Sequence, residues 1–146
     1  MKQLTLTAVL LTAVLSGNMC FAQSSNLHGT WTIDFDETLD LVTSDRMVQY
    51  DTLSEEGQNQ LRTQLLDQRY IFNSDSTFLM GTNGAQYYDG RWVIESNLLK
   101  LTFNQGANLE YPMEFVNASE VKITVVADPT SNALFHQYLL KKSASN

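Results

Sequence analysis

The fold is decided by residues 70–103, which read YIFNSDSTFLMGTNGAQYYDGRWVIESNLLKLTF. Aromatic and β-branched residues form short runs in this stretch, and clusters of Asn, Asp, Ser and Gly separate the runs. This pattern is typical of β-strands joined by tight turns. Strands this close in sequence are antiparallel, because a parallel crossover needs about a dozen residues or more. The stretch therefore predicts a row of antiparallel strands.

Period-two alternation of apolar and polar residues extends the pattern toward both ends of the chain. We expect eight strands, at residues 28–35, 69–72, 77–80, 86–94, 99–103, 109–115, 121–125 and 134–141. The last has no clean register, since either Leu134, His136, Tyr138 and Leu140 or their neighbours could face inward. Eight antiparallel strands in sequence order can close into a barrel, which removes exposed edges. We predict a mainly β fold, an eight-stranded antiparallel meander barrel, with an open sheet or small sandwich as the alternative.

A helical insertion is expected at about residues 36–68, between the first two strands. Gly and Pro almost vanish there, and Leu, Gln, Glu and Asp become frequent. Apolar residues recur at helical spacing in two groups, on either side of residues 51–54. Ser54 is a suitable N-cap, since Glu55 and Glu56 follow it in the first turn. The pattern predicts two short helices.

The N-terminal residues 1–22 have the features of a signal peptide. Lys2 precedes an uncharged apolar run at residues 4–15, and small residues flank Phe21 before a cleavage point at Gln23. The apolar run is too short for a convincing membrane span. We therefore expect one exported domain at residues 23–146, located in the periplasm or outside the cell. The alternative is a lipid anchor at Cys20, although Met19 is not the small residue that this processing favours.

Composition and motifs limit the function classes. The net charge of −7 argues against nucleic acid and anionic membrane surfaces as partners. Two distant histidines and a single cysteine provide no zinc spacing, and no nucleophile motif occurs. Asp34-x-Asp36-Glu37 could hold calcium weakly, but a strand exit leading into a helix is the favoured interpretation. We expect neither an enzyme nor a metal or cofactor site. Asp51-Thr52-Leu53 and Asp75-Ser76-Thr77 resemble bacterial O-glycosylation sequences, and the unmodified interpretation is favoured.

Three motifs together resemble those of a known family: Gly29-Thr30-Trp31, the sequence FNSDSTF at residues 72–78, and Gly90-Arg91-Trp92. They resemble the bacterial secreted lipocalin-like domains of the calycin superfamily, over residues 26–142. That family has F-x-x-D-G-T-F in the second motif, so Ser76 stands where glycine is usual. The resemblance implies that Trp31 packs across the closed end of the barrel beneath an arginine from the last strand. Only Lys141 and Lys142 are available for this role.

The interior of an eight-stranded barrel is either filled by side chains or holds one small ligand. Tyrosines are suitable lining residues, because each combines an apolar ring with a polar tip. The predicted ligand-binding residues are Tyr88, Trp92, Tyr111, Met113 and Tyr138, although core packing is an alternative role for the tryptophan. The first hypothesis is therefore a protein that binds a small hydrophobic or amphipathic ligand beneath a helical lid. The second is an interaction module with a filled barrel, whose acidic helical segment docks a protein of the cell envelope.

Overall fold

The computed structural model describes residues 26–82, 87–125 and 133–143. Its strands are β1 (Gly29–Asp34), β2 (Gln68–Phe72), β3 (Thr77–Thr82), β4 (Tyr88–Glu95), β5 (Leu98–Phe103), β6 (Asn108–Asn117), β7 (Glu120–Thr124) and β8 (Gln137–Lys142). Between β1 and β2 lie the helices α2 (Phe35–Asp40), α3 (Ser44–Asp51) and α4 (Glu55–Leu66). Residues 1–25, which include the expected signal peptide and Cys20, lie outside the described residues.

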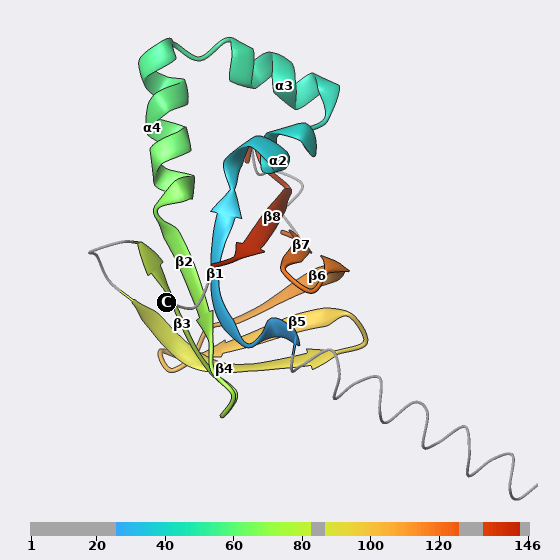
Figure 1. Ribbon diagram of the computed structural model, residues 1–146. Helices are drawn as coiled ribbons and strands as arrows, with labels where there is room; N and C mark the ends of the chain where they lie inside the picture. The colour runs from blue at the N-terminus through green and yellow to red at the C-terminus, as the bar shows by residue number, and fades with distance from the viewer. Residues whose placement is uncertain (1–25, 83–86, 126–132, 144–146) are drawn as a thin grey trace, which may run out of the picture.

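The strands form a closed antiparallel barrel in the order β1 to β8. Each strand pairs with its neighbours in sequence, and β1 also pairs with β8, from Trp31 opposite Lys142 to Asp34 opposite Leu139. This β1–β8 pairing, hereafter the seam, leaves no open edge (Figure 1). The prediction of a mainly β, closed, eight-stranded antiparallel barrel is confirmed, and the open sheet is wrong.

One half of the barrel interior is filled by large side chains. The inward positions alternate along each strand as expected, and the buried rings include Trp31, Phe72, Phe78, Trp92 and Phe103. The rings of Phe78 and Phe103 pack edge to face, with centroids 5.1 Å apart. A Cβ atom at Gly90 would collide with the Thr102 carbonyl and crowd the Phe78 ring. Gly90 of β4 lies between Phe78 of β3 and Phe103 of β5, so the absence of a side chain there leaves room for the two rings to meet.

Trp31 is fully buried at the start of β1 and is held from two sides. Its Nε1 donates a hydrogen bond to the Leu27 carbonyl at 2.7 Å. The Lys142 ammonium lies 5.4 Å from the centre of the Trp31 ring and donates to the Asn26 carbonyl at 3.2 Å. A cation over an indole face is attracted by the ring quadrupole. Lys142, from the last strand, is thus the basic residue that covers Trp31.

The helices extend from one end of the barrel, hereafter the helical end, with α3 farthest from the strands (Figure 1). Ser54 caps α4 as predicted, since its Oγ accepts from the Gly57 N–H at 3.2 Å. The predicted break at residues 51–54 is also present, but three helices replace the expected two. Phe35 was expected to end the first strand and instead begins α2, because the Asp34 carboxylate caps that helix. Among the described helices, none has the length and apolar character needed to cross a membrane.

Strand β8 has no clean alternation because it is buried on both faces. Leu140 faces the barrel core, while the adjacent Leu139 is also buried. The Leu139 N–H donates to the hydroxyl of Thr38 in α2, at 3.0 Å. Helix α2 therefore covers the outer face of β8, which explains the ambiguous register in the sequence. The strand begins at Gln137, so Leu134 and His136 precede it.

Candidate functional site

A cavity of about 560 Å³ occupies the barrel interior toward the helical end. Its walls come from the start of β2, the end of β3, the start of β4, and from β6 and β8. We call this space the tyrosine cavity. Its lining residues are Gln68, Tyr70, Met80, Gly81, Thr82, Tyr88, Tyr111, Val125 and Tyr138. None of these residues belongs to α2, α3 or α4, so the described helices do not form its wall. The barrel is thus filled at one end and hollow at the other.

Four tyrosines line this cavity, and Tyr70 lies deepest. Part of its surface remains accessible because it faces the cavity, and its hydroxyl donates to Gln68 Oε1 at 2.9 Å. Burial raises the pKa of Tyr70 well above the usual range, and the nearby phenols of Tyr111 and Tyr138 add to the effect. Burial also raises the pKa values of Tyr111 and Tyr138. These phenols therefore stay neutral at physiological pH, where each can donate a hydrogen bond.

The chemistry of the wall is neutral and amphipathic. Among the described residues, no charged side chain lines the cavity, and its apolar surface comes from tyrosine rings, Met80 and Val125. Polar groups are present in small number, as is usual in small-molecule sites. Within the described part of the chain, the hydroxyls of Tyr111 and Tyr138 form no hydrogen bond with another residue. They are available to a bound molecule.

Three of the five predicted ligand-binding residues meet in this cavity: Tyr88, Tyr111 and Tyr138. Trp92 lies in the filled half, where its Nε1 donates to the Asn73 carbonyl at 3.3 Å and its ring contacts Phe72. Met113 is buried and borders a different pocket of about 500 Å³, beside Ile94. The structure therefore does not bring Trp92 and Met113 together with the tyrosines.

Sequence reasoning missed Tyr70, Gln68, Met80 and Thr82. The signal was present in the same alternation that identified the core. Tyr70 stands two residues before the buried Phe72, and Met80 stands two residues after the buried Phe78. Residues separated by two positions share a face of a strand. Extending each inward row to the end of its strand would have found both cavity residues.

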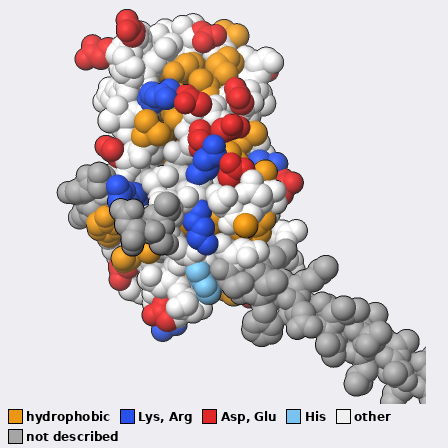
Figure 2. All heavy atoms as spheres, in the orientation of Figure 1, with side chains coloured by type: hydrophobic (Ala, Val, Ile, Leu, Met, Phe, Trp, Pro, Cys, Tyr) orange, Lys and Arg blue, Asp and Glu red, His pale blue; other side chains and the backbone are white. Residues whose placement is uncertain are grey.

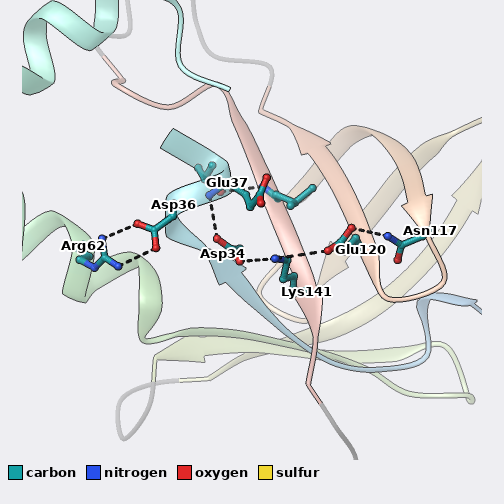
Figure 3. A network of polar contacts seen from close by, with 9 residues as sticks. Asp34, Asp36, Glu37, Arg62, Asn117, Glu120 and Lys141 are labelled. Atoms are coloured by element: carbon teal, nitrogen blue, oxygen red, sulfur yellow. Dashed lines mark hydrogen bonds and ion pairs between the residues drawn. The ribbon is translucent and has the colours of Figure 1, made fainter. Parts of the chain in front are cut away.

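The acidic residues at the exit of β1 are occupied by protein partners. Asp34 caps α2 and pairs with Lys141 at 2.8 Å, while both carboxylate oxygens of Asp36 bind Arg62, at 2.8 and 3.1 Å (Figure 3). Figure 2 shows basic and acidic side chains intermingled along the middle of this face of the molecule. Among the described residues, no three His, Cys, Asp or Glu side chains are grouped to hold a metal ion. The Asp34-x-Asp36-Glu37 motif is thus the end of a strand that leads into the N-terminus of a helix.

Comparison of the chain with protein families, curated proteins and solved structures finds no match.

Proposed function

We propose that this protein is an exported, non-enzymatic binding protein of lipocalin-like type, which takes up a small amphipathic molecule in the tyrosine cavity. The observation that carries the proposal is the hollow half of the barrel, about 560 Å³ in volume and lined by Tyr70, Tyr88, Tyr111 and Tyr138. This volume falls in the range of about 300–1,000 Å³ that is typical of small-molecule sites. The filled half provides the rigid base on which such a site depends.

The wall chemistry specifies the class of ligand. The tyrosine rings and the Met80 thioether provide an apolar surface for most of the ligand. The hydroxyls of Tyr111 and Tyr138 can donate hydrogen bonds to a neutral acceptor on the ligand, such as a carbonyl or ether oxygen. An anion would lose its hydration without gaining a cationic partner, because no lysine or arginine of the described chain lines the cavity. The ligand is therefore neutral, mostly apolar, and carries one or two hydrogen-bond acceptors.

The lipocalin-like and exported parts of the proposal rest on sequence and geometry together. The two Gly-x-Trp motifs fall in β1 and β4, and Lys142 covers Trp31 at the place where the resemblance implies an arginine. The features of residues 1–22 support export to the periplasm or the exterior, with a lipid anchor at Cys20 as the alternative route. A non-enzymatic role follows from the absence of a nucleophile motif in the sequence.

Binding of Nile red, a neutral amphipathic dye, tests the proposal directly. We expect saturable fluorescence enhancement with the wild-type protein, and native mass spectrometry should detect a co-purifying molecule that solvent extraction removes. The double variant Tyr111→Phe/Tyr138→Phe loses two donors and should bind the dye about fivefold more weakly or worse. Tyr87→Phe is the matched control, because Tyr87 is 46% exposed and does not line the cavity. Absence of both saturable dye binding and a co-purifying molecule would reject the proposal.

The second candidate function is docking of an envelope protein by the acidic helical segment. One observation favours it: Val48 in α3 is 63% exposed, and Leu53 and Leu66 are 41% and 45% exposed. Crosslinking in intact cells should then capture a partner protein, and Val48→Glu should abolish this capture. Val93→Glu is the control, since Val93 is an exposed apolar residue of β4, on the barrel. Equal capture by both variants would remove this candidate.

A further inference from the structure

A further pocket lies on the outer face of the barrel, between the α2–α3 connection, the end of β7 and the beginning of β8. Its volume is about 280 Å³. Its polar lining includes Arg46, Thr124, His136 and Gln137, and its apolar lining includes Val42 and Leu134. Thr124 and Gln137 alternate along the chain with Val125 and Tyr138, which line the tyrosine cavity. The two cavities therefore lie on opposite faces of the same strands.

Arg46 is the unusual residue of this pocket. Its Nη1 atom is fully enclosed, and it has no hydrogen-bond partner. Buried polar atoms in native structures are nearly always hydrogen-bonded, and an unpaired charged group is the most unfavourable exception. The Arg46 side chain as a whole is partly exposed, so this one guanidinium nitrogen is the atom that a bound acceptor would satisfy.

The lack of a carboxylate beside Arg46 is notable because the protein has carboxylates in excess. Its net charge is −7, with 16 acidic against 9 basic residues. Lys100, Lys122, Lys141 and Arg62 each form an ion pair with Asp or Glu. No ion pair joins Arg46 to any described acidic residue. Among the described residues, the positive charge of this pocket is therefore not neutralised by an ion pair.

Helix α3 adds to this positive potential. Arg46 lies in its first turn, and the N-cap residue Thr43 makes no side-chain hydrogen bond to the helix. The first N–H groups of a helix lack intrahelical partners and carry partial positive charge, so a cation there is disfavoured and an anion is favoured. Thr43 and Arg46 both line the pocket. The free guanidinium and the uncapped helix terminus therefore favour the same occupant.

We propose that this pocket binds a small monocarboxylate with a short apolar chain. The Arg46 guanidinium provides the planar donor fork that matches a carboxylate, and Gln137 and Thr124 provide further polar contacts. Val42 and Leu134 line the part of the pocket that takes the chain. The volume equals that of about nine water molecules at ~30 Å³ each, which limits the ligand to a small molecule. One guanidinium balances one negative charge, so a monoanion is favoured over a dianion such as phosphate.

Titration of the protein with sodium butyrate, followed by two-dimensional NMR and by thermal unfolding, tests the proposal. Butyrate should saturate a set of amide shifts at residues 41–46 and 134–137 and raise Tm, whereas neutral butyramide should do neither. Arg46→Gln should weaken butyrate binding at least tenfold, and Arg46→Lys, which keeps the charge without the fork, should bind with intermediate affinity. Arg69→Gln is the matched control, because Arg69 is an exposed arginine of β2 and does not line the pocket.

Several outcomes would overturn the proposal. Equal effects of butyrate and butyramide would remove the role of charge, and stronger binding of chloride or phosphate would show a general anion site. Butyrate binding that survives Arg46→Gln would place the ligand elsewhere. If Arg46→Gln does not fold, Leu134→Trp, which fills the pocket without changing its charge, should abolish binding instead. Nile red binding in the tyrosine cavity should be unaffected by butyrate, so the two sites can fail independently.

Discussion

The Lys141 ammonium lies 2.8 Å from the Asp34 carboxylate, across the seam that closes the barrel. The same ammonium lies 3.6 Å from Glu120 of β7, and the same carboxylate accepts the Glu37 N–H at the start of α2 (Figure 3). Asp34 therefore fastens the last strand to the first and begins the helical insertion. A single side chain joins barrel closure to the position of the helices.

Substitution of Asp34 should separate these two roles. Asp34→Ala removes both the cap and the ion pair, and we expect the free energy of unfolding to fall by about 1–2 kcal/mol, the usual effect of a lost N-cap. Asp34→Asn keeps an equally good cap and should lose less. Urea denaturation at low and high salt measures both losses. The loss in Asp34→Asn should nearly vanish at high salt, whereas Asp34→Ala should keep the part that comes from the missing cap, because partly exposed ion pairs are screened and the cap is not. Equal losses in the two variants would contradict this division.

The pKa of Asp34 gives the same contact a pH dependence. Burial alone would raise this pKa, but the hydrogen bond from Lys141 and the backbone hydrogen bonds outweigh it, so the pKa lies below its ordinary value of 3.8. A depressed carboxyl pKa contributes stability above the unfolded-state value, and this stability is lost as pH falls through the folded-state value. Asp34→Asn should therefore show a shallower loss of stability below pH 3.8 than the wild-type protein.

The hydrogen bond between Thr38 and Leu139 ties α2 to β8 and provides a second test of the seam. Thr38 is fully buried, and its hydroxyl accepts the Leu139 N–H at 3.0 Å. Thr38→Val keeps the shape but leaves that N–H without its acceptor, so we expect a loss of about 1–3 kcal/mol in unfolding free energy. Thr38→Ser keeps the hydroxyl and should lose less. Chemical denaturation monitored by tryptophan fluorescence distinguishes them, and a stable Thr38→Val would contradict the assigned role.

The barrel could be predicted from the sequence because apolar, inward-facing residues alternate with polar residues along each strand. Leu99, Leu101 and Phe103 are all buried as expected. The error at Phe35 has the opposite origin: the residue continues the alternation of Trp31 and Ile33, yet it begins a helix that packs on β8. The contact with β8 joins residues far apart in sequence, whereas the local signal for the helix start, the Asp34 cap, competes with the alternation that continues to Phe35.

The two cavities also differ in whether a local sequence pattern could predict them. The alternation of apolar and polar residues along single strands was sufficient to propose Tyr88, Tyr111 and Tyr138. In a closed barrel, the inward-facing residues of all strands line the same interior. The Arg46 pocket depends on the placement of α3 against residues of β7 and the approach to β8. Such a placement is a property of tertiary packing, and the sequence around Arg46 resembles any polar helix start.

Ser76 provides a test of backbone strain at the β2–β3 turn. Its φ of 65° lies in the left-handed region, where a side chain is disfavoured by about 1–2 kcal/mol and glycine is not. Ser76→Gly should therefore leave stability unchanged or raise it by up to about 1 kcal/mol, since glycine's greater unfolded-state entropy offsets part of the relief. Ser76→Ala retains the strain and is the control. A loss of stability in Ser76→Gly larger than in Ser76→Ala would contradict a strained turn.

The buried phenols of the tyrosine cavity predict the behaviour of the protein in alkali. Burial holds the pKa of Tyr70 above its ordinary value of 10.0, and those of Tyr111 and Tyr138 are raised in the same direction. The unfolded chain then releases protons first, so the stability present below pH 10 is lost as pH rises through the raised values. Tyrosinate absorbance should show Tyr70, Tyr111 and Tyr138 ionising above pH 10.

Two variants sharpen this alkaline test. Tyr70→Phe removes the most strongly shifted phenol, so its unfolding free energy should fall less steeply above pH 10 than that of the wild-type protein. Tyr111→Phe removes a second raised phenol of the cavity and should reduce the slope in the same direction. A ligand that fills the cavity should delay the three late ionisations further, because it replaces the water that reaches these hydroxyls. Ionisation of all six tyrosines in one step near pH 10 would mean that water solvates the cavity freely, and the neutral donor role of Tyr111 and Tyr138 would then be wrong.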